Sequence, residues 1–472
     1  MISKKILCIL ILLSLSLNTI HVLADDSDNK DSDDKDSKKD SNSDKKDSGS
    51  DEPESFLVSC GSENEVEDSS GRKWSPDSKF LNSSDFSSTE QLNKTDPTLP
   101  SEDPYKSARI FNATSSYIFS VTTTKRLWIR LHFYPFEYSK IDPAKAYFSV
   151  AANEFTLLKN YSAFTNAAAL TMAYIVKEFS LTPSTCGKLN ITITPSPQPE
   201  GAIGFLNGIE VIPMPDVFKT TPLVGFHDQT IEVQNSSVQT MYRVNVGGDY
   251  VPPTEDAGGN RTWYEDGGYL IGSPNTKYGV TSDADSNNVT IKYDGDEYMA
   301  PEAVYNTARS MGPSPNVNLN TNLTWVFDVD ANFTYVVRLH FCDFELELTN
   351  QRVFDIYLNN HTAQEGADVI AWAGGGGSSG KGITVFKDYA IYLNDRNNGN
   401  EQIWVALHPN EKSKPEYYDA LLNGLEVFKI NDTCGNFGSE YPVAVRHYSY
   451  SEEFLEKTKD ECKLGDQDTD DN

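Results

Sequence analysis

The chain has 472 residues, with 69 acidic and 40 basic side chains, so its formal net charge at pH 7 is −29. Such an acidic chain repels a phosphate backbone, which excludes a basic nucleic-acid-binding protein. Only six cysteines are present, too few for disulfides to act as the main scaffold. The length allows two or three domains, because a domain usually holds about 100–200 residues.

The first 24 residues predict a secretory signal peptide. Lys4 and Lys5 precede an apolar run over residues 6–17, and residues 22–24 offer a cleavage site. A membrane anchor is the alternative, but the apolar run is shorter than the ~20 residues needed to cross a bilayer. We therefore expect a secreted, extracellular protein with no membrane span of its own.

Charged segments are predicted at both ends of the mature chain. Residues 25–55 hold 13 acidic residues and 6 lysines, and no aliphatic or aromatic residue. This segment cannot bury enough apolar area to offset the entropy of ordering, so we expect a disordered arm. Residues 431–472 are expected to form an acidic C-terminal tail. From Ser451 onward this tail contains nine acids and three lysines.

Alternation of apolar and polar residues with period two dominates between these arms, which is typical of β-strands. In residues 127–133 the odd positions are apolar, while Arg130 and His132 share the opposite face with Trp128. This pattern predicts a half-buried strand. Many short strands separated by Asn, Gly and Pro, without alternating helices, favour antiparallel β-sandwiches. The predicted fold class is therefore all-β.

An internal repeat of about two hundred residues divides the chain. Four blocks recur in the same order: 71–74 as 259–263, RLHF at 130–133 as 338–341, 148–153 as 354–359, and LNGIEV at 206–211 as LNGLEV at 422–427. We therefore predict two domains, 56–218 and 226–430, joined by a linker at 219–225. The Asn-Gly pairs at 207–208 and 423–424 predict tight turns with positive φ angles.

These blocks resemble the tandem malectin-like ectodomain of plant receptor kinases of the FERONIA type. The motifs that carry the resemblance are VSCG (58–61), GRKW (71–74), YFSV (147–150), FTLL (155–158) and FLNGIE (205–210) in the first copy, and YRVNVGG (242–248), RSMG (309–312), RLHFC (338–342), KDY (387–389) and LHPN (407–410) in the second. The resemblance covers roughly residues 56–430. It implies two jelly-roll-like β-sandwiches that act as an extracellular sensor in the apoplast or cell wall.

The resemblance also implies partners. Family members are linked to basic, cysteine-rich signalling peptides (rapid alkalinisation factors), to cell-wall pectin and to a lipid-anchored co-receptor. They normally continue into a membrane helix and a cytoplasmic kinase, whereas this sequence contains no kinase motif. We therefore expect the sensing half of a receptor without its signalling half.

The charge of the chain distinguishes between the two candidate ligands, a basic peptide and pectin. An acidic protein attracts a basic peptide, whereas polyanionic pectin needs a local basic patch such as Lys125, Arg126 and Arg130. The sequence favours a non-catalytic binding protein that recognises extracellular carbohydrate or a basic peptide and acts as a decoy or co-receptor. The alternative is a subunit or structural wall protein that works with a transmembrane receptor kinase.

Enzyme chemistry is not expected, and neither is a cofactor. No Gly-x-Ser-x-Gly nucleophile motif occurs. His132 and His340 lack the further ligands that a zinc site needs. The glycine-rich stretch at 374–380 runs into an alternating segment, which predicts a mobile hairpin loop and not a phosphate-binding loop.

Aromatic residues near strand ends are candidate ligand-binding residues, because flat rings stack on the apolar faces of sugars. The candidates are Tyr134, Phe136 and Tyr138 after the first shared strand, and Trp263, Tyr264 and Tyr269 at the front of the second copy. The alternative is that these residues are core or edge aromatics.

Covalent modifications are predicted from two patterns. Asn-x-Ser/Thr sequons predict N-glycosylation at Asn82, Asn93, Asn112, Asn160, Asn190, Asn235, Asn260, Asn288, Asn322, Asn332, Asn360 and Asn431. Cys434 and Cys462 flank the segment after the second domain and are candidates for a disulfide. Cys60, Cys186 and Cys342 lie on or beside predicted strands and are expected to be buried.

Overall fold

The structure is a computed structural model that describes residues 55–438, except 84, 93–95, 122–124, 136–137, 183–186, 272–279, 294, 296, 375–379 and 397–398. The predicted signal peptide, most of the N-terminal arm, Cys186, the centre of the glycine-rich loop and the end of the acidic tail with Cys462 lie outside these residues. None of the helices in the described part is long and apolar enough to cross a membrane.

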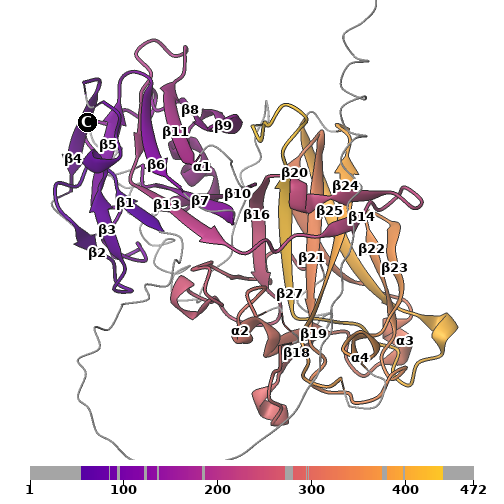
Figure 1. Cartoon of the computed structure of the whole chain (residues 1–472). Helices are drawn as coiled ribbons and strands as arrows, with labels where there is room; N and C mark the ends of the chain where they lie inside the picture. The colour runs from indigo at the N-terminus through magenta and orange to yellow at the C-terminus, as the bar shows by residue number, and fades with distance from the viewer. Residues whose placement is uncertain are drawn as a thin grey trace, which may run out of the picture. The chain divides into compact units, whose positions relative to one another are not determined.

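The described chain is built mainly of β-strands, as predicted (Figure 1). The first repeat contains β1 (Phe56–Ser59), β2 (Val66–Glu67), β3 (Lys73–Pro76), β4 (Ser87–Gln91), β5 (Ser107–Phe111), β6 (Ser115–Ser120), β7 (Arg126–Phe133), β8 (Phe148–Ala152), β9 (Phe155–Tyr161), α1 (Ala163–Leu170), β10 (Ile175–Leu181), β11 (Lys188–Pro195), β12 (Gly204–Leu206) and β13 (Gly208–Met214). Ser162 caps the N-terminus of helix α1, because its hydroxyl accepts a hydrogen bond from the Thr165 N–H.

The rest of the described chain follows the same plan. It contains β14 (Thr220–Pro222), β15 (Thr230–Glu232), β16 (Val238–Asn245), β17 (Tyr264–Glu265), β18 (Val280–Asp283), α2 (Glu302–Tyr305), β19 (Thr307–Ser310), α3 (Pro315–Asn318), β20 (Leu323–Asp330), β21 (Phe333–Phe341), β22 (Phe354–Leu358), β23 (His361–Ala367), α4 (Val369–Trp372), β24 (Val385–Leu393), β25 (Asn400–Pro409), β26 (Leu421–Leu422) and β27 (Gly424–Ile430). The predicted linker at 219–225 includes β14, which pairs with β15.

One long sheet runs through both repeats in the order β2-β3-β1-β13-β7-β10-β16-β27-β21-β24, with β17 beside β16. The repeats join where β10 pairs antiparallel with β16, at Glu178 opposite Thr240. Two four-stranded sheets, β6-β11-β8-β9 and β20-β25-β22-β23, each share a buried core with one half of the long sheet. Each repeat is therefore a β-sandwich, and the two sandwiches share a continuous sheet.

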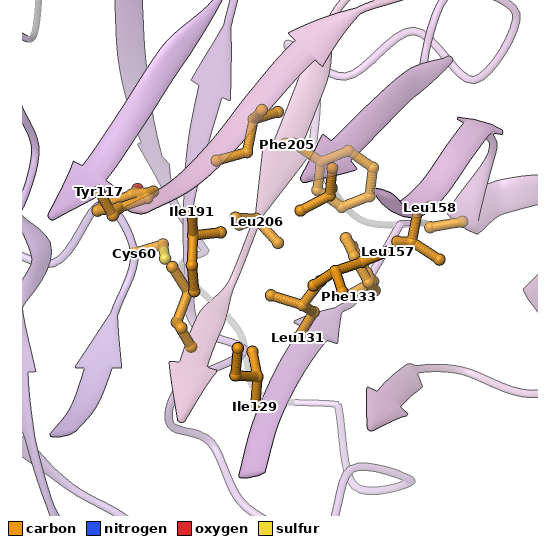
Figure 2. Packing of buried hydrophobic residues seen from close by; sticks show 14 of the residues in the cluster. Cys60, Tyr117, Ile129, Leu131, Phe133, Leu157, Leu158, Ile191, Phe205 and Leu206 are labelled. Atoms are coloured by element: carbon orange, nitrogen blue, oxygen red, sulfur yellow. The ribbon is translucent and has the colours of Figure 1, made fainter. Parts of the chain in front are cut away.

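The core of the first sandwich is formed by alternate residues of facing strands (Figure 2). Leu131 and Phe133 from β7 pack with Ile191 from β11 and Phe205 from β12, and all four are fully buried. A Leu, Ile or Phe side chain contributes about 1.5–3 kcal/mol when it is removed from water. Figure 2 also shows Cys60 in this core, and the predicted burial of Cys60 and Cys342 is confirmed.

The prediction that β7 is half-buried was wrong. All eight of its residues are buried, because both faces of the strand are covered. Odd-numbered residues face the sandwich core, whereas Trp128, Arg130 and His132 face the junction with the second repeat. A period-two pattern of apolar and polar residues shows which face of a strand is apolar. It does not show whether the polar face is exposed to solvent or buried, because charged side chains with buried partners give the same pattern.

The predicted Asn-Gly tight turns are also wrong, since none of these residues has a positive φ. Asn207 is fully buried at the point where the chain leaves β12 and enters β13 in the long sheet. Its side-chain oxygen accepts a hydrogen bond from the Tyr134 N–H at 2.6 Å. Gly208 is needed for space, because a Cβ there would lie 2.7 Å from Pro104. Asn423 accepts a hydrogen bond from the Cys342 N–H in the same way.

The segment after the second repeat returns to the first repeat, although the sequence predicted an acidic tail from residue 431. Asn436 forms a parallel bridge with Thr156 at the start of β9. Phe437 is buried in the first core, with its ring centroid 5.5 Å from that of Phe179. Residues up to 438 therefore belong to the folded structure.

Candidate functional site

The junction of the two repeats holds a cleft of about 440 Å³. Its floor is the face of the long sheet formed by β13, β7, β10 and β16. Its walls come from segments 68–74, 100–105, 174–176 and 250–264. Both repeats therefore contribute to one cavity, whose volume lies in the range of ligand pockets, about 300–1,000 Å³.

The floor of the cleft is a chain of alternating charges. Arg130 bonds Glu178 at 2.6 Å and Glu210 at 3.0 Å. Arg243 of the second repeat bonds the same Glu178 at 2.8 Å and Glu426 at 2.7 Å. These side chains are nearly inaccessible to water, so each charge depends on its partners. Glu178 links the two repeats through Arg243.

The pKa values of the three buried glutamates are set by these arginines. Burial alone would raise the pKa of Glu178, but Arg243 and Arg130 outweigh burial and lower it to about 2. Glu210 and Glu426 are also buried, and Arg130 and Arg243 respectively hold their pKa values well below the usual range. All three carboxylates are therefore ionised at any physiological pH.

A neutral histidine completes the network in each repeat. His132 Nε2 lies 2.9 Å from Glu210 Oε1, and its Nδ1 lies 2.9 Å from the Tyr105 hydroxyl. An ionised carboxylate only accepts, so Nε2 carries the proton and Nδ1 accepts the hydrogen bond from Tyr105. Burial lowers the pKa of His132 despite the opposing effect of Glu210. His340 makes the same contacts with Glu426 and Tyr305.

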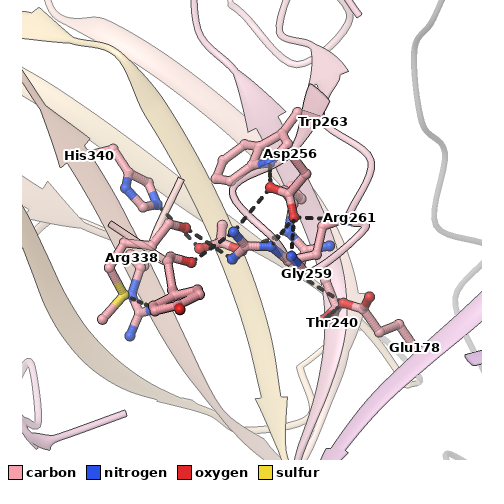
Figure 3. Close-up of polar contacts among 12 residues, drawn as sticks. Glu178, Thr240, Asp256, Gly259, Arg261, Trp263, Arg338 and His340 are labelled. Carbon is pink, nitrogen blue, oxygen red and sulfur yellow. Dashed lines mark hydrogen bonds and ion pairs between the residues drawn. The ribbon is translucent and has the colours of Figure 1, made fainter. Parts of the chain in front are cut away.

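The repeated tryptophans are held in the same way in both sandwiches. Asp68 accepts hydrogen bonds from Arg72 Nε and Trp74 Nε1. In the second repeat Asp256 accepts from Arg261 and Trp263, and Figure 3 shows these residues beside Arg338 and His340. The equivalence of these contacts confirms the duplication predicted from the sequence blocks.

In the second repeat, described residues of the segment from Tyr293 to Ala300 pack against the counterparts of the residues that line the cleft. The ring of Tyr293 packs edge-on against Tyr305, with centroids 5.8 Å apart. The Met299 sulfur accepts a hydrogen bond from Arg338 Nη1 at 3.4 Å, and Ala300 is completely buried beside Tyr305. Side chains of the segment around Tyr293 and Met299 therefore pack against the equivalent position of the second repeat.

Tyrosine side chains form the walls of the cleft. Tyr174 of the first repeat and Tyr250 and Tyr264 of the second are partly exposed there. Tyr250 and Tyr264 pack at a ring distance of 5.9 Å, and Tyr174 packs against Tyr105 at 5.2 Å. Asp103 lies at the same wall, and partial burial raises the pKa of its carboxyl although Lys106 opposes the shift.

The structure distributes the six predicted aromatic residues unevenly. Tyr134, Tyr138, Trp263 and Tyr269 are at most 5% exposed, and they pack as the core aromatics that the sequence left as an alternative. Tyr264 lines the cleft, whereas Phe136 lies outside the described residues. Tyr264 is therefore the one described candidate that reaches the cleft.

Two of the three residues considered for a basic patch, Arg126 and Arg130, are buried, whereas Lys125 is partly exposed. Arg126 is fully buried and donates to Asp216 and to the backbone oxygens of Gln234 and Ser236. Arg130 is 4% exposed and bound to carboxylates. These arginines stabilise the fold and offer no accessible site for a polyanion.

Sequence reasoning missed most of the cleft. Tyr174 and Tyr250 lie outside the repeated blocks, so no pattern marked them. Glu210 and Glu426 do lie inside the repeated LNGIEV and LNGLEV blocks. A glutamate at the same place in two mainly apolar repeated blocks, together with a repeated Arg-Leu-His, was the signal that could have revealed the buried network.

The predicted glycosylation sequons are mostly on the surface. The exposed ones are Asn82, Asn112, Asn160, Asn190, Asn235, Asn288, Asn322, Asn332 and Asn360. Asn431 is partly buried and hydrogen-bonds the Ser237 N–H. Asn260 is also partly buried and lines the cleft. Asn93 lies outside the described residues, and Cys434 of the predicted disulfide is exposed.

The sequence of this chain was compared with models of known protein families. The family model of the malectin-like domain matches residues 58–430. The chain belongs to the malectin-like family. Within the part that the structure describes, no group of three or more His, Cys, Asp or Glu side chains is placed to hold a metal ion.

Several receptor kinases of Arabidopsis thaliana are similar to this malectin-like chain. It is 46% identical to the receptor-like protein kinase ANXUR1 over 395 residues, which cover 82% of this chain and 45% of the relative. It is 44% identical to FERONIA over 402 residues, 83% of this chain and 44% of the relative. The chain therefore spans less than half the length of these relatives.

Solved ectodomains have the same fold as this malectin-like chain. The crystal structure of the ANXUR1 extracellular domain from Arabidopsis thaliana has a TM-score of 0.76 and 45% identity, covering 82% of this chain and all of that domain. A crystal structure of the peptide RALF23 in complex with FER and LLG2 matches with a TM-score of 0.72 and 42% identity, covering 83% and 98% of the two chains. The two tandem, jelly-roll-like sandwiches predicted from the sequence are thereby confirmed.

Proposed function

We propose that this chain is an extracellular, non-catalytic ligand-binding protein that recognises a basic signalling peptide of the rapid alkalinisation factor type. A lipid-anchored co-receptor is the proposed partner in recognition, and a receptor kinase is the proposed partner in signalling. The relative FER has been solved with the peptide RALF23 and LLG2, which supports this proposal. The proposed role of the chain toward that peptide is that of a decoy or co-receptor.

The observation that carries the proposal is the uneven distribution of charge between the repeats. Residues 56–218 contain 17 acidic and 14 basic side chains, a net charge of −3. Residues 226–430 contain 28 acidic and 13 basic side chains, a net charge of −15. A basic peptide is therefore attracted chiefly to the second repeat, where the negative potential raises its association rate.

An acidic cluster lies beside the cleft on the second repeat. Asp249 is exposed and Glu265 is partly exposed, and both neighbour wall tyrosines in sequence. Burial raises the pKa of Glu265, and the nearby charges of Asp249 and Asp266 raise it further. This excess of like charge is relieved when a lysine or arginine approaches, so the cluster suits a basic ligand.

A titration of the purified protein with a synthetic alkalinisation-type peptide, with and without a lipid-anchored co-receptor, tests the proposal. Asp249→Lys and Glu265→Lys together should weaken binding roughly tenfold, because they replace attraction by repulsion. Glu200→Lys in the first repeat reverses an exposed charge and should leave binding unchanged. Absence of saturable binding, with or without the co-receptor, would overturn the proposal.

Pectin is less favoured as a ligand than a basic peptide. The arginines considered for a basic patch are buried, and the second repeat is strongly acidic. A polygalacturonate chain would therefore meet repulsion over most of this surface. Oligogalacturonides serve as the anionic comparison in the titration, and we expect them to show no saturable binding at moderate salt.

A further inference from the structure

A lysine lies in an otherwise apolar row of side chains on strand β10. Ile175, Phe179 and Leu181 alternate along this strand and are buried in the first core. Lys177 occupies the remaining position of this alternation, so its side chain lies on the face of the strand opposite Glu178 and the cleft. The side chain is partly buried there, which is unfavourable for an ammonium group that has no partner.

The ammonium group of Lys177 has no such partner among the described residues. Its Nζ donates no hydrogen bond and forms no ion pair there, and it lies 5.7 Å from the centroid of the Tyr161 ring. The buried Asp330 carboxylate instead binds the ammonium of Lys429 at 2.6 Å, and Lys429 also donates to the Phe437 carbonyl oxygen at 2.6 Å. Lys177 is therefore left without a counter-ion of its own.

Lys177 lines a small cavity of about 30 Å³, to which both repeats and the segment after the second repeat contribute. Leu157 of the first repeat, Met241 of the second and Phe437 supply apolar walls. Tyr161 lines the same cavity, and its hydroxyl is completely buried without a hydrogen-bond partner. A cavity of this size holds one small molecule.

The surroundings keep part of the Lys177 amine neutral. Burial lowers the pKa of Lys177 to about 8, Asp330 opposes this shift, and the positive charge of Lys429 adds to it. Among the described residues that line the cavity, the other titratable side chains are Tyr161 and Lys159, an exposed lysine of β9. At about pH 7.5 roughly a quarter of the amine is therefore neutral, against about 0.1% for an ordinary lysine.

We propose that Lys177 is a site of reversible carbamylation by carbon dioxide. The lone pair of the neutral Nζ attacks the carbon of carbon dioxide, a C–N bond forms, and one C=O electron pair moves onto oxygen. The nitrogen then releases a proton to water, which leaves a carbamate anion, and protonation of the nitrogen reverses the step. Carbon dioxide is small and uncharged, as the size and the apolar walls of the cavity require. This site goes beyond the proposed function and does not depend on peptide binding.

The charges around Lys177 favour the carbamate over the ammonium. As an ammonium, Lys177 is repelled by Lys429, whereas a carbamate is attracted to that cation. Asp330 repels the carbamate, but its charge is balanced by the Lys429 ammonium at 2.6 Å. The Tyr161 hydroxyl supplies a donor that no described residue uses. Carbamylation therefore replaces an unpaired cation by an anion that has a partner.

The test uses the whole purified protein and isotope-labelled bicarbonate, which supplies labelled carbon dioxide in solution. Triethyloxonium ions convert a carbamate into a stable ethyl carbamate, and mass spectrometry of the peptides locates it. At about pH 7.5 we expect labelling of Lys177 to exceed that of Lys159 roughly tenfold or more, because more of the Lys177 amine is neutral. Labelling should rise between about pH 6.5 and 8.5, because carbamate formation releases protons.

Two arginine variants assign the carbamate signal in a carbon NMR spectrum. Lys177→Arg keeps the positive charge but removes the amine, so the signal should disappear, because a guanidinium does not lose its proton. Lys159→Arg changes an exposed lysine at the same cavity and should leave the signal unchanged.

Two results would overturn the proposal. One is that Lys177 carries no label at any pH in this range. The other is that Lys177 is labelled no more strongly than Lys159. Both measurements are made on the wild-type protein, so they decide the question even if Lys177→Arg fails to fold.

Discussion

Arg243 forms ion pairs with a carboxylate of each repeat. It lies between Glu178 of the first repeat and Glu426 of the second, and these carboxylates raise the pKa of Arg243 even though burial opposes the shift. Its guanidinium also lies 5.9 Å from the ring of Trp128 and 5.7 Å from that of Trp263. The loss of this one cation would leave two buried carboxylates short of a partner.

Arg243→Met should lower the free energy of unfolding by about 3–5 kcal/mol, the usual loss when one partner of a buried ion pair is removed. Chemical denaturation measures this loss. Lys412→Met removes an exposed cation that pairs with Glu365 and should leave the midpoint unchanged. Equal midpoints for both variants would show that the buried network does not stabilise the junction.

The buried histidines predict a second effect at the residue scale. Burial lowers the pKa values of His132 and His340 below the ordinary value. In the unfolded chain these side chains bind protons near pH 6.5, so below that pH the unfolded state takes up more protons than the folded state. The free energy of unfolding should therefore fall as the pH decreases from about 6.5 toward 5.

Thermal melts between about pH 5 and 7.5 measure this dependence. The double variant His132→Gln and His340→Gln should be less stable at pH 7.5 but should have a flatter profile. A steep loss in the double variant equal to that of the wild type would assign the pH dependence to other groups.

At the scale of elements, duplicated glycines mark close approaches between neighbouring strands. Gly61 and Gly247 have φ values of +83° and +77°. A Cβ at Gly61 would lie 2.3 Å from the Ala108 carbonyl oxygen, and one at Gly247 would lie 2.4 Å from that of Ala308. These glycines allow the ends of β1 and β16 to pack against β5 and β19.

Gly61→Ala and Gly247→Ala should each destabilise the protein, because the added methyl group collides with backbone. Gly71→Ala is a matched control: its φ is +78°, but its Cβ would lie no closer than 3.8 Å to Glu67. We expect Gly61→Ala and Gly247→Ala to cost about 1–3 kcal/mol more than Gly71→Ala, the usual penalty for overpacking. Equal losses in urea denaturation would mean that backbone strain alone requires glycine.

The elements also show which parts of the fold the sequence predicts. Strands such as β7 and β21 were predictable because their core-facing residues alternate strictly, and the repeated blocks identified the two sandwiches. Their burial on both faces was not predictable, because it depends on contacts such as Arg130 with Glu178, which is 48 residues away. The Asn207–Gly208 pair was misread because a buried asparagine that joins two sheets has the same local sequence as a tight turn.

The candidate site illustrates the same limit. The cleft forms only when residues around Tyr174 and Tyr250 meet across the β10–β16 pair, a contact between two repeats that no local period encodes. Aromatic residues selected for their position after a strand were mostly core residues, such as Tyr134. Composition predicted the acidity of the chain, whereas locating the cleft required the fold.

At the scale of the whole molecule, the continuous sheet should make the two repeats unfold together. Strands β10 and β16 pair directly, Arg243 joins the repeats, and Phe437 returns to the first core from the end of the second. Unfolding one sandwich alone would expose a sheet edge and leave Glu178 without one of its partners. Scanning calorimetry should therefore show one cooperative transition, and two well-separated transitions would show that the repeats are independent.

The central claim is that the acidic second repeat recognises a basic peptide. Hydrogen exchange of the protein, with and without a saturating alkalinisation-type peptide and its co-receptor, tests this claim most directly. We predict that the peptide slows exchange within residues 226–430, around Asp249 and Glu265, and that the protection weakens as salt is raised. Protection confined to residues 56–218, or no protection at all at saturation, would contradict the account.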